Sequence, residues 1–529
     1  MSAPNAHLPY QNAANPVEGR VEDLISRMTV DKKASLLFHD MIMMGNNGAL
    51  APANAQFDML SNAELIHDKK MSHFNLIRPI KDARIAARWY NNIQREARKT
   101  RLGIPVTIST NPRNHFNNNV GTGFEAGVFS QWLESLGLAA LQSANLVKQF
   151  ADTARQEYLA VGLRLALHPQ QGTTLGSRLV STMTKHFPGG GPQKDGEDPH
   201  FAYGREQVYP GNNLNYHLLL FKAAISAGAA QMMLYYGMPI GTSYNKVGFA
   251  FNRPIIQGPL REELGFKGIV CTDWGLVTDK QIMGQPMPAR ANLVAAGHIT
   301  ENRVNTSVRR LLREKFMLGL FNNPFVDEEA DARIMGRDEF CKLGADAQQR
   351  SYTLLTNFSE YLPLRGLLAD QVKIYAEGIS AETLKARGLY IVEDPADAQV
   401  ALLRLKAPYK PRPGGFEALL HAGSLEYSAE ERARQAKIFA AMPTVIVDIY
   451  ADQPPVVPEL LEQATAVLLS YGSSSNAFLD IVFGIRELEG KLPFDLPSLM
   501  SAVEQSRSDM PYDTRDPLFR FGHGLRYSH

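Results

Sequence analysis

Short apolar runs alternate with longer amphipathic segments through the first part of the chain. Apolar residues at helical spacing predict helices over residues 21–38, with a second helix start at Thr29, and over residues 83–98 and 136–157. The short apolar runs between and after these helices predict strands, at residues 104–110, 163–167, 180–186, 231–236 and 269–273. Strands that alternate with helices indicate an α/β fold with a parallel sheet and right-handed crossovers, and the number of units favours a TIM-like (β/α)-barrel.

Two places do not fit a regular barrel. About a dozen residues separate the strands that end at Leu167 and begin at Val180, whereas a parallel crossover with its own helix needs at least that many. The stretch after Gln285 likewise leaves little room for a helix and a last strand before the helix predicted at residues 309–320. We count about seven strand candidates, so the expected barrel is incomplete or unusually closed.

A second series of strands and helices follows, with strands predicted at residues 372–376, 400–405, 444–450 and 466–470. This pattern predicts an α/β sandwich with a parallel sheet of its own. The expected division is a barrel domain at residues 21–322, a linker and helix at 323–350, and a sandwich domain at 351–529. A chain of 529 residues is long enough for at least two cores.

Charged side chains end two of the predicted barrel strands. Asp273 follows one apolar run between two glycines, and Lys185 and His186 end another. The carboxyl ends of parallel strands gather at one edge of a sheet, where ligand chemistry concentrates. The alternatives are an Asp that caps the next helix, a surface Lys and a packed His.

Composition excludes several classes of protein. The net charge is +1 and no block of like charges occurs, which argues against a general polyanion or nucleic-acid binder. We find no apolar run of the roughly 18 residues that a membrane span needs. The first residues have no apolar signal core, so we expect a cytoplasmic protein, or a periplasmic or secreted one whose leader was removed. Cys271 and Cys341 are expected to be free thiols, and we expect no metal and no cofactor.

Several stretches resemble glycoside hydrolase family 3, the β-glucosidases and exo-β-glucanases. Residues 185–189 read Lys-His-Phe-Pro-Gly, and residues 272–274 read Thr-Asp-Trp where the family has Ser-Asp-Trp. Residues 21–29 and 517–525 extend the resemblance over most of the chain. The resemblance implies that Lys185 and His186 bind the sugar in the first subsite and that Asp273 is the nucleophile.

Further roles follow from the same resemblance. Tyr236 aligns with a family Tyr beside the nucleophile and could donate to its carboxylate, or be a core aromatic. Trp274 could stack on a sugar face, or belong to the core. Asn111 stands where the family commonly has a sugar-binding Asp, and an Arg-containing sugar-binding segment of the family is absent. Arg113 and His115 could compensate for these two altered sugar contacts, or be exposed loop residues.

A retaining glycosidase also needs an acid/base carboxyl roughly 5 Å from its nucleophile. The family takes this group from a loop of the second domain. After the strand at residues 400–405, that loop contains Glu417, just beyond two glycines, and then Glu426 as a second candidate. Each could instead be a solvated charge at a helix end.

The expected function is therefore an exo-acting, retaining β-glucosidase that acts on β-glucosides or β-gluco-oligosaccharides. One alternative is the β-N-acetylhexosaminidase branch of the same family, which has an Asp/His pair in the loop after Lys-His-Phe-Pro-Gly. Asp198 and His200 are similar to that pair, although their spacing differs. Another alternative is a catalytically impaired sugar-binding relative. The sequence leaves a homodimer open.

Overall fold

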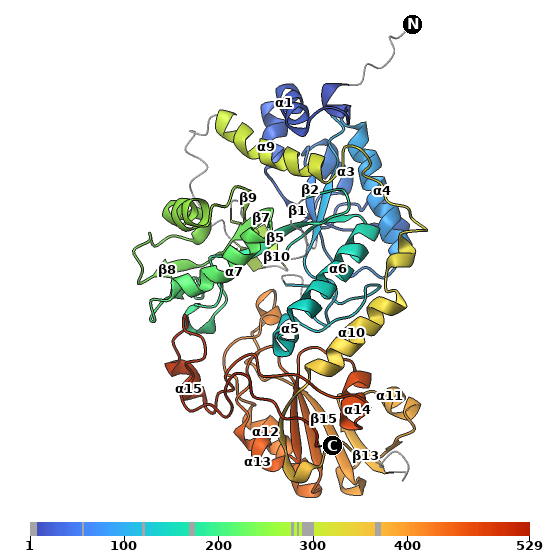
Figure 1. The fold of residues 1–529 in the computed structure, drawn as a ribbon, viewed down its shortest axis with the longest axis vertical. Coiled ribbons are helices and arrows are strands. Elements are labelled where there is room, and N and C mark those ends of the chain that lie inside the picture. The colour runs from blue at the N-terminus through green and yellow to red at the C-terminus, as the bar shows by residue number, and fades with distance from the viewer. Residues whose placement is uncertain are drawn as a thin grey trace.

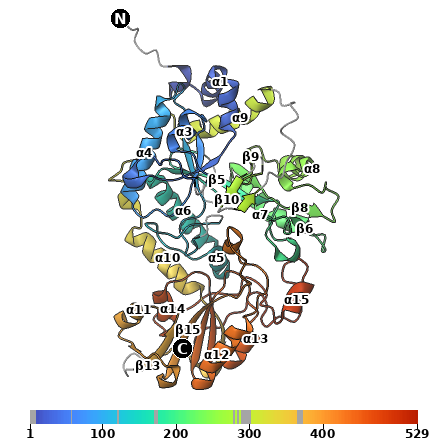
Figure 2. The same cartoon turned by 180° about the vertical axis from the view of Figure 1, so that it is seen from behind.

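The computed structural model describes residues 8–55, 58–118, 122–168, 175–276, 280–282, 285–287, 301–364 and 372–528. The chain forms two units, one above the other, each built on its own sheet (Figure 1). Helix α10 (Asp338–Ser351) runs down one side from the upper unit to the lower one, as the view from behind also shows (Figure 2).

The upper sheet has seven strands, and each pairs in parallel with its neighbours in the order β1-β2-β3-β4-β5-β7-β9. Its strands are β1 (Asp40–Ile42), β2 (His73–Leu76), β3 (Thr107–Thr110), β4 (Leu163–Ala166), β5 (Ser181–Phe187), β7 (Gln231–Leu234) and β9 (Ile269–Thr272). The predicted parallel sheet and its five named strands are confirmed, and β1 and β2 are added to them. Within the described residues, no strand joins β9 to β1.

Helices surround this sheet, and one of the predicted ones is interrupted. Residues 21–38 form two helices, and the second start predicted at Thr29 is confirmed, because its side chain accepts a hydrogen bond from the Lys32 N–H. The helix expected over 136–157 breaks where Gln142 adopts a left-handed φ of 49°. The helices are α1 (Val17–Arg27), α2 (Val30–Leu36), α3 (Asn62–His67), α4 (Ala83–Lys99), α5 (Ser135–Leu141), α6 (Ala144–Ala160), α7 (Leu214–Ser226), α8 (Arg253–Ile255) with the π-helix Ile256–Glu263, and α9 (Glu301–Met317).

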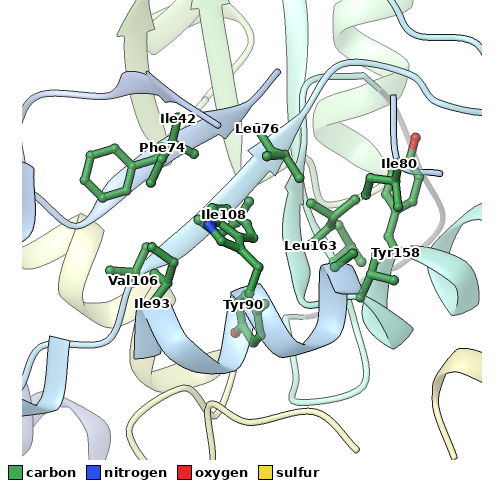
Figure 3. Packing of buried hydrophobic residues seen from close by; sticks show 14 of the residues in the cluster. Ile42, Phe74, Leu76, Ile80, Tyr90, Ile93, Val106, Ile108, Tyr158 and Leu163 are labelled. Carbon is green, nitrogen blue, oxygen red and sulfur yellow. The ribbon is translucent and has the colours of Figure 1, made fainter. Parts of the chain in front are cut away.

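Apolar side chains of the first strands pack against α4 and α6 (Figure 3). Phe74 of β2, Ile108 of β3 and Leu163 of β4 are all buried, and Tyr90 and Ile93 of α4 meet them. Burying a large apolar side chain contributes about 1.5–3 kcal/mol, so this cluster holds the first strands in a fixed register.

The two irregular connections lie where the sequence predicts them. Strands β4 and β5 pair directly, and the described part of their connection contains no helix, while residues 169–174 lie outside the described residues. After β9, the short strands β10 (Lys280–Ile282) and β11 (Gln285–Met287) form an antiparallel hairpin. Residues 288–300, where the family resemblance implies a helix and a last strand, lie outside the described residues.

Side chains of helix α9 form hydrogen bonds at the amino-terminal ends of strands β2, β3, β5 and β7. Its Glu314 accepts hydrogen bonds from Ser181 Oγ of β5 and Gln231 Nε2 of β7. The ammonium of Lys315 donates to Ser72 O, Pro105 O and Thr107 Oγ1 at the starts of β2 and β3. Burial raises the pKa of Glu314 to about 7 and holds the pKa of Lys315 well below its usual range. One helix therefore ties both halves of the sheet together.

The lower sheet has the order β12-β17-β16-β15-β13-β14. Its strands are β12 (Thr353–Asn357), β13 (Lys373–Glu377), β14 (Tyr390–Ile391), β15 (Val400–Lys406), β16 (Val445–Tyr450) and β17 (Ala466–Ser470). The strands predicted near 372–376, 400–405, 444–450 and 466–470 are confirmed. The four strands and β14 pair in parallel as expected, whereas β12 pairs antiparallel with the outer edge of β17.

Helices cover both faces of the lower sheet. Val447 and Leu469 point to the face covered by α12 and α13, whereas their neighbours Ile446 and Leu468 point to the face of α11 and α14. This alternation gives three layers, as a sandwich requires. The helices are α11 (Ala381–Ala386), α12 (Ala429–Ala441), α13 (Pro458–Gln463), α14 (Ser475–Val482) and α15 (Met500–Gln505).

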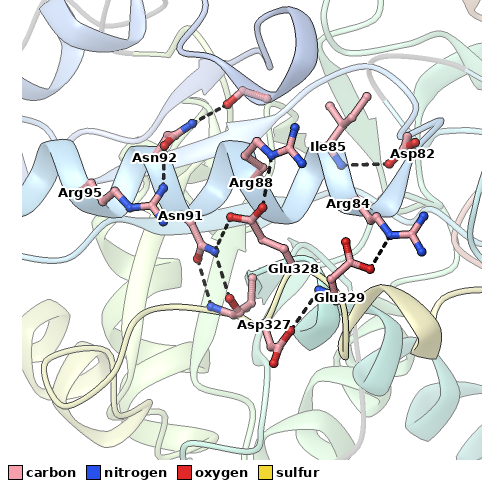
Figure 4. A network of polar contacts seen from close by, with 12 residues as sticks. Asp82, Arg84, Ile85, Arg88, Asn91, Asn92, Arg95, Asp327, Glu328 and Glu329 are labelled. Atoms are coloured by element: carbon pink, nitrogen blue, oxygen red, sulfur yellow. Dashed lines mark hydrogen bonds and ion pairs between the residues drawn. The ribbon is translucent and has the colours of Figure 1, made fainter.

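The segment between the units is attached to the upper one (Figure 4). Asn91 of α4 donates to Val326 O, and Arg88 and Arg84 of the same helix pair with Glu328 and Glu329. The start of the linker is thereby held against α4. No helix within the described residues is long and apolar enough to cross a membrane.

Candidate active site

The carboxyl ends of β3, β5, β7 and β9 bring together five of the residues that the sequence singles out. Asn111 follows β3, Lys185 and His186 end β5, Tyr236 follows β7, and Asp273 follows β9. Because these strands are parallel neighbours in one sheet, their ends lie at the same edge. The side-chain contacts below join them into one cluster.

Asp273 is 5% exposed, and its two carboxylate oxygens have different surroundings. Its Oδ1 accepts a hydrogen bond from the backbone N–H of Trp274, at 2.8 Å. Its Oδ2 lies 3.2 Å from His186 Nε2 but has no partner with the geometry of a hydrogen bond among the described residues. One oxygen is thus fixed by the backbone while the other is left for a further partner.

Lys185 and His186 are held beside this carboxylate. The Lys185 ammonium donates to Asn111 Oδ1 at 2.8 Å, and the His186 ring lies 4.9 Å from the Tyr235 ring. Burial lowers the pKa of His186 to about 4, against the opposing effect of Asp273, so His186 is neutral at neutral pH. Burial also lowers the pKa of Lys185, and again Asp273 opposes the shift.

The hydrogen bond expected from Tyr236 to the Asp273 carboxylate needs correction. The Tyr236 hydroxyl donates to the backbone carbonyl of Trp274, at 2.6 Å. A phenol has a single proton, so this bond uses the one donor of Tyr236. Tyr236 therefore supports the strand end that carries Asp273 through this contact with the backbone.

The indole of Trp274 is half-buried. Its ring lies 5.3 Å from the His39 ring, nearly edge to face, and packs against the small apolar cluster that contains Leu165 and Met183. The strand before it, β9, is half-buried, because β9 forms the edge of the described sheet. Cys271 in this strand and Cys341 in α10 are both free thiols, as expected.

Arg113 and His115 do not lie on an exposed loop. Arg113 is fully buried and donates to Thr110 Oγ1, Arg78 O and Leu76 O. The expectation that Arg113 binds substrate is therefore wrong: its guanidinium ties the ends of β2 and β3 together. Burial lowers its pKa to about 10. His115 is also buried, with Nδ1 2.9 Å from Leu133 O.

The loop after β15 reaches the upper unit and carries Glu417 with it. The Tyr203 hydroxyl, from the loop after β5, donates to Glu417 Oε1. Arg412 of the same β15 loop contacts both carboxylate oxygens of Glu197 at 2.6 Å. Glu426 lies instead 3.8 Å from Arg432 of α12, within its own unit. Of the two acid/base candidates, Glu417 is the one in contact with the unit that carries Asp273.

Asp198 and His200 do form a pair. Asp198 Oδ1 lies 2.6 Å from His200 Nδ1, and the His200 ring lies 4.3 Å from Tyr236 and 5.3 Å from Phe416. His200 therefore lies between Tyr236, which supports the strand end that carries Asp273, and the loop that carries Glu417.

Sequence reasoning missed His39, Glu197 and Tyr203. Nothing in the sequence distinguishes a Tyr that meets a carboxylate 214 positions away from any other loop Tyr. For Glu197 and His39 too, the contacts that matter are made only after folding.

A cavity of about 530 Å³ lies elsewhere on the surface, lined by residues that include Gly127, Cys341 and Ser474, and contains none of the site residues above. Among the parts of the chain that the structure describes, no group of three or more His, Cys, Asp or Glu side chains is placed to hold a metal ion.

Residues 170–298 match the model of the glycosyl hydrolase family 3 N terminal domain. Beta-glucosidase C of Emericella nidulans is 49% identical over an alignment that covers 98% of this chain and 94% of that relative. The periplasmic beta-glucosidase/beta-xylosidase of Dickeya chrysanthemi is 32% identical, with 98% of this chain and 91% of the relative covered.

A solved structure of a β-glucosidase from Erythrobacter marinus superimposes with a TM-score of 0.73 at 18% identity, covering 99% of this chain and 84% of that one. At 18% identity, this similarity shows a shared fold. The alignment with the Emericella relative spans 586 positions, more than the 529 residues of this chain, so that relative contains residues that this chain lacks.

Proposed function

Because the chain belongs to glycoside hydrolase family 3 and is a glycoside hydrolase, we propose that it is an exo-acting, retaining β-glucosidase that releases terminal β-D-glucosyl residues. The observation that carries the proposal is the placement of two carboxylates from different units. Asp273 lies at the end of β9, and Glu417 on a loop of the lower unit is hydrogen-bonded to the upper one.

In this proposal Asp273 is the nucleophile. Its Oδ1 is fixed by the Trp274 N–H, and Oδ2 attacks the anomeric carbon to form a covalent glycosyl-enzyme. A neutral His186 beside Oδ2 leaves the negative charge of the carboxylate uncancelled, which a nucleophile needs.

Glu417 is the proposed acid/base. As an acid it gives its proton to the leaving oxygen, and as a base it then takes a proton from the water that hydrolyses the intermediate. Lys185, His186 and Asn111 are proposed to bind the hydroxyls of the terminal sugar. Their contacts with one another and with Asp273 place these side chains beside the proposed nucleophile. Trp274 is proposed to offer the exposed part of its indole to the same sugar.

We further propose that the upper unit is the barrel domain, residues 21–322, in an opened form, joined by residues 323–350 to the sandwich domain at 351–529. The described part of the connection between β4 and β5 contains no helix, and the alignment with the Emericella relative is longer than the chain; both observations support shortened connections in this barrel. We propose β-linked gluco-oligosaccharides or aryl β-glucosides as substrates. The relatives' names favour glucosides over N-acetylglucosaminides, although Asp198 and His200 form a pair. A periplasmic or secreted location is proposed from the Dickeya relative.

The test measures release of the phenol from an aryl β-glucoside and from the matching aryl N-acetyl-β-glucosaminide. We expect turnover of the glucoside alone, loss of that turnover in Asp273→Asn, and β-glucose as the first product anomer. Glu417→Gln should lose activity, whereas Glu426→Gln, in the same loop, should retain it. Sugar binding without turnover by the unaltered protein would instead support an impaired relative.

A further inference from the structure

Two loops from different units meet beside the proposed site. One follows β5 and contains Glu197, His200 and Tyr203, and the other follows β15 and contains Arg412 and Glu417. An ion pair, ring contacts and a hydrogen bond join them, so the loop that carries Glu417 is held at several points along its length.

Tyr203 is the residue of the first loop that touches the Glu417 carboxyl itself. Its ring is half exposed, stacks on Phe201 at 5.4 Å with an angle of 11°, and lies 5.5 Å from the Arg412 guanidinium. These contacts orient the phenol, whose hydroxyl donates to Glu417 Oε1. Glu417 Oε2 accepts no hydrogen bond from the residues that the structure describes.

We propose that Tyr203 is a positioning residue that holds the proton-donating carboxyl of Glu417. The bond to Oε1 fixes the carboxyl plane and leaves Oε2 to carry the proton toward the leaving oxygen. Because Tyr203 belongs to the unit of the nucleophile and Glu417 to the other, their bond sets the separation of the two carboxylates. This inference rests on the proposed role of Glu417.

The effect of removing the Tyr203 hydroxyl on the reaction rate should depend on the leaving group of the substrate. A poor leaving group, such as the methoxide of methyl β-glucoside, needs the proton of the acid, whereas 2,4-dinitrophenolate departs without it. The ratio kcat/KM reports formation of the glycosyl-enzyme. It should therefore be sensitive to Tyr203 for the first substrate and insensitive for the second.

The experiment measures kcat/KM for both substrates in Tyr203→Phe, Glu417→Gln and the double variant, with Tyr409→Phe as the matched control. Tyr409 lies in the same β15 loop, stacked on His421 at 3.7 Å. We expect Tyr203→Phe to lower the value for methyl β-glucoside by about 10- to 100-fold and that for the dinitrophenyl glucoside by less than about twofold. The double variant should lose no more than Glu417→Gln, because one interaction is removed only once.

Equal losses on both substrates, or no loss on either, would overturn the role of Tyr203. Glu417→Gln separates this failure from that of the proposed function. If Glu417→Gln shows the dependence on leaving group and Tyr203→Phe does not, the inference about Tyr203 alone is wrong. If Glu417→Gln shows no such dependence, the acid/base assignment is wrong and the inference fails with it.

Discussion

His186 Nε2 lies 3.2 Å from Asp273 Oδ2, across the ends of two strands that β7 separates in the sheet. Burial disfavours the charged imidazole more than the neighbouring carboxylate favours it. The imidazole of His186 is therefore neutral at neutral pH.

This pairing predicts a pH-dependent stability. The unfolded chain binds a proton at His186 below about pH 6.5, whereas the folded chain binds it only near pH 4. The stability that neutral His186 contributes is thus present at pH 7 and is lost as the pH falls toward 4. Between those values the wild-type chain should lose more unfolding free energy than His186→Gln, measured by urea denaturation. Equal losses would show that His186 titrates normally in the fold.

Asn111→Asp should strengthen substrate binding. The Lys185 ammonium already donates to Asn111 Oδ1 at 2.8 Å, and an Asp would make this bond charge-assisted while keeping a second oxygen for a sugar hydroxyl. We expect KM for an aryl β-glucoside to fall by about three- to tenfold, with Lys185→Met raising it. An unchanged KM in Asn111→Asp would mean that this side chain does not face the substrate.

Glu314 should give a pH dependence of the opposite sign. Its pKa is about 7 in the folded chain and near 4.5 when unfolded, so its stabilising effect is complete below pH 4.5 and is lost as the pH rises through 7. The loss has an upper limit of about 3 kcal/mol. Urea unfolding at pH 4.5 and 8.5 should show this loss in the wild type, and Glu314→Gln should lack it. A parallel pH profile in the variant would contradict the assignment.

The ion pair of Arg412 and Glu197 should couple the two loops. Each side chain is about a quarter exposed, so the pair is only partly screened by salt. Reversing one charge in Arg412→Glu should lower kcat/KM by about fivefold, and adding Glu197→Arg should restore most of it. Failure of the double variant to recover would indicate that the residues act separately.

The local pattern of the sequence predicts much of the fold. The strand before Asp273 and the strand that contains Lys185 and His186 lie where the two apolar runs predict them. The break at Gln142 is less visible, because the apolar spacing continues through it and only the left-handed φ of 49° ends the helix. The antiparallel pairing of β12 depends on which sheet edge is free, and a single strand does not encode that.

The site is predictable in its strand-end residues and not in the contacts between loops. Arg113 follows a strand as a ligand-binding residue would, yet its donors go to Leu76 O and Arg78 O of a neighbouring segment. The bond between Tyr203 and Glu417 requires both units to be folded and docked. Such long-range contacts follow from packing as a whole and leave no periodicity in the sequence.

The central claim is that Asp273 forms a covalent bond to the substrate. The protein is incubated with an activated 2-deoxy-2-fluoro-β-glucoside, whose fluorine slows hydrolysis of the glycosyl-enzyme. Peptide mapping by mass spectrometry then locates the residue that carries the sugar. We predict one fluoroglucosyl group per chain, on the peptide that contains Asp273, and none in Asp273→Asn. A label on another residue, or an unlabelled chain that releases α-glucose from β-glucosides, would contradict the account.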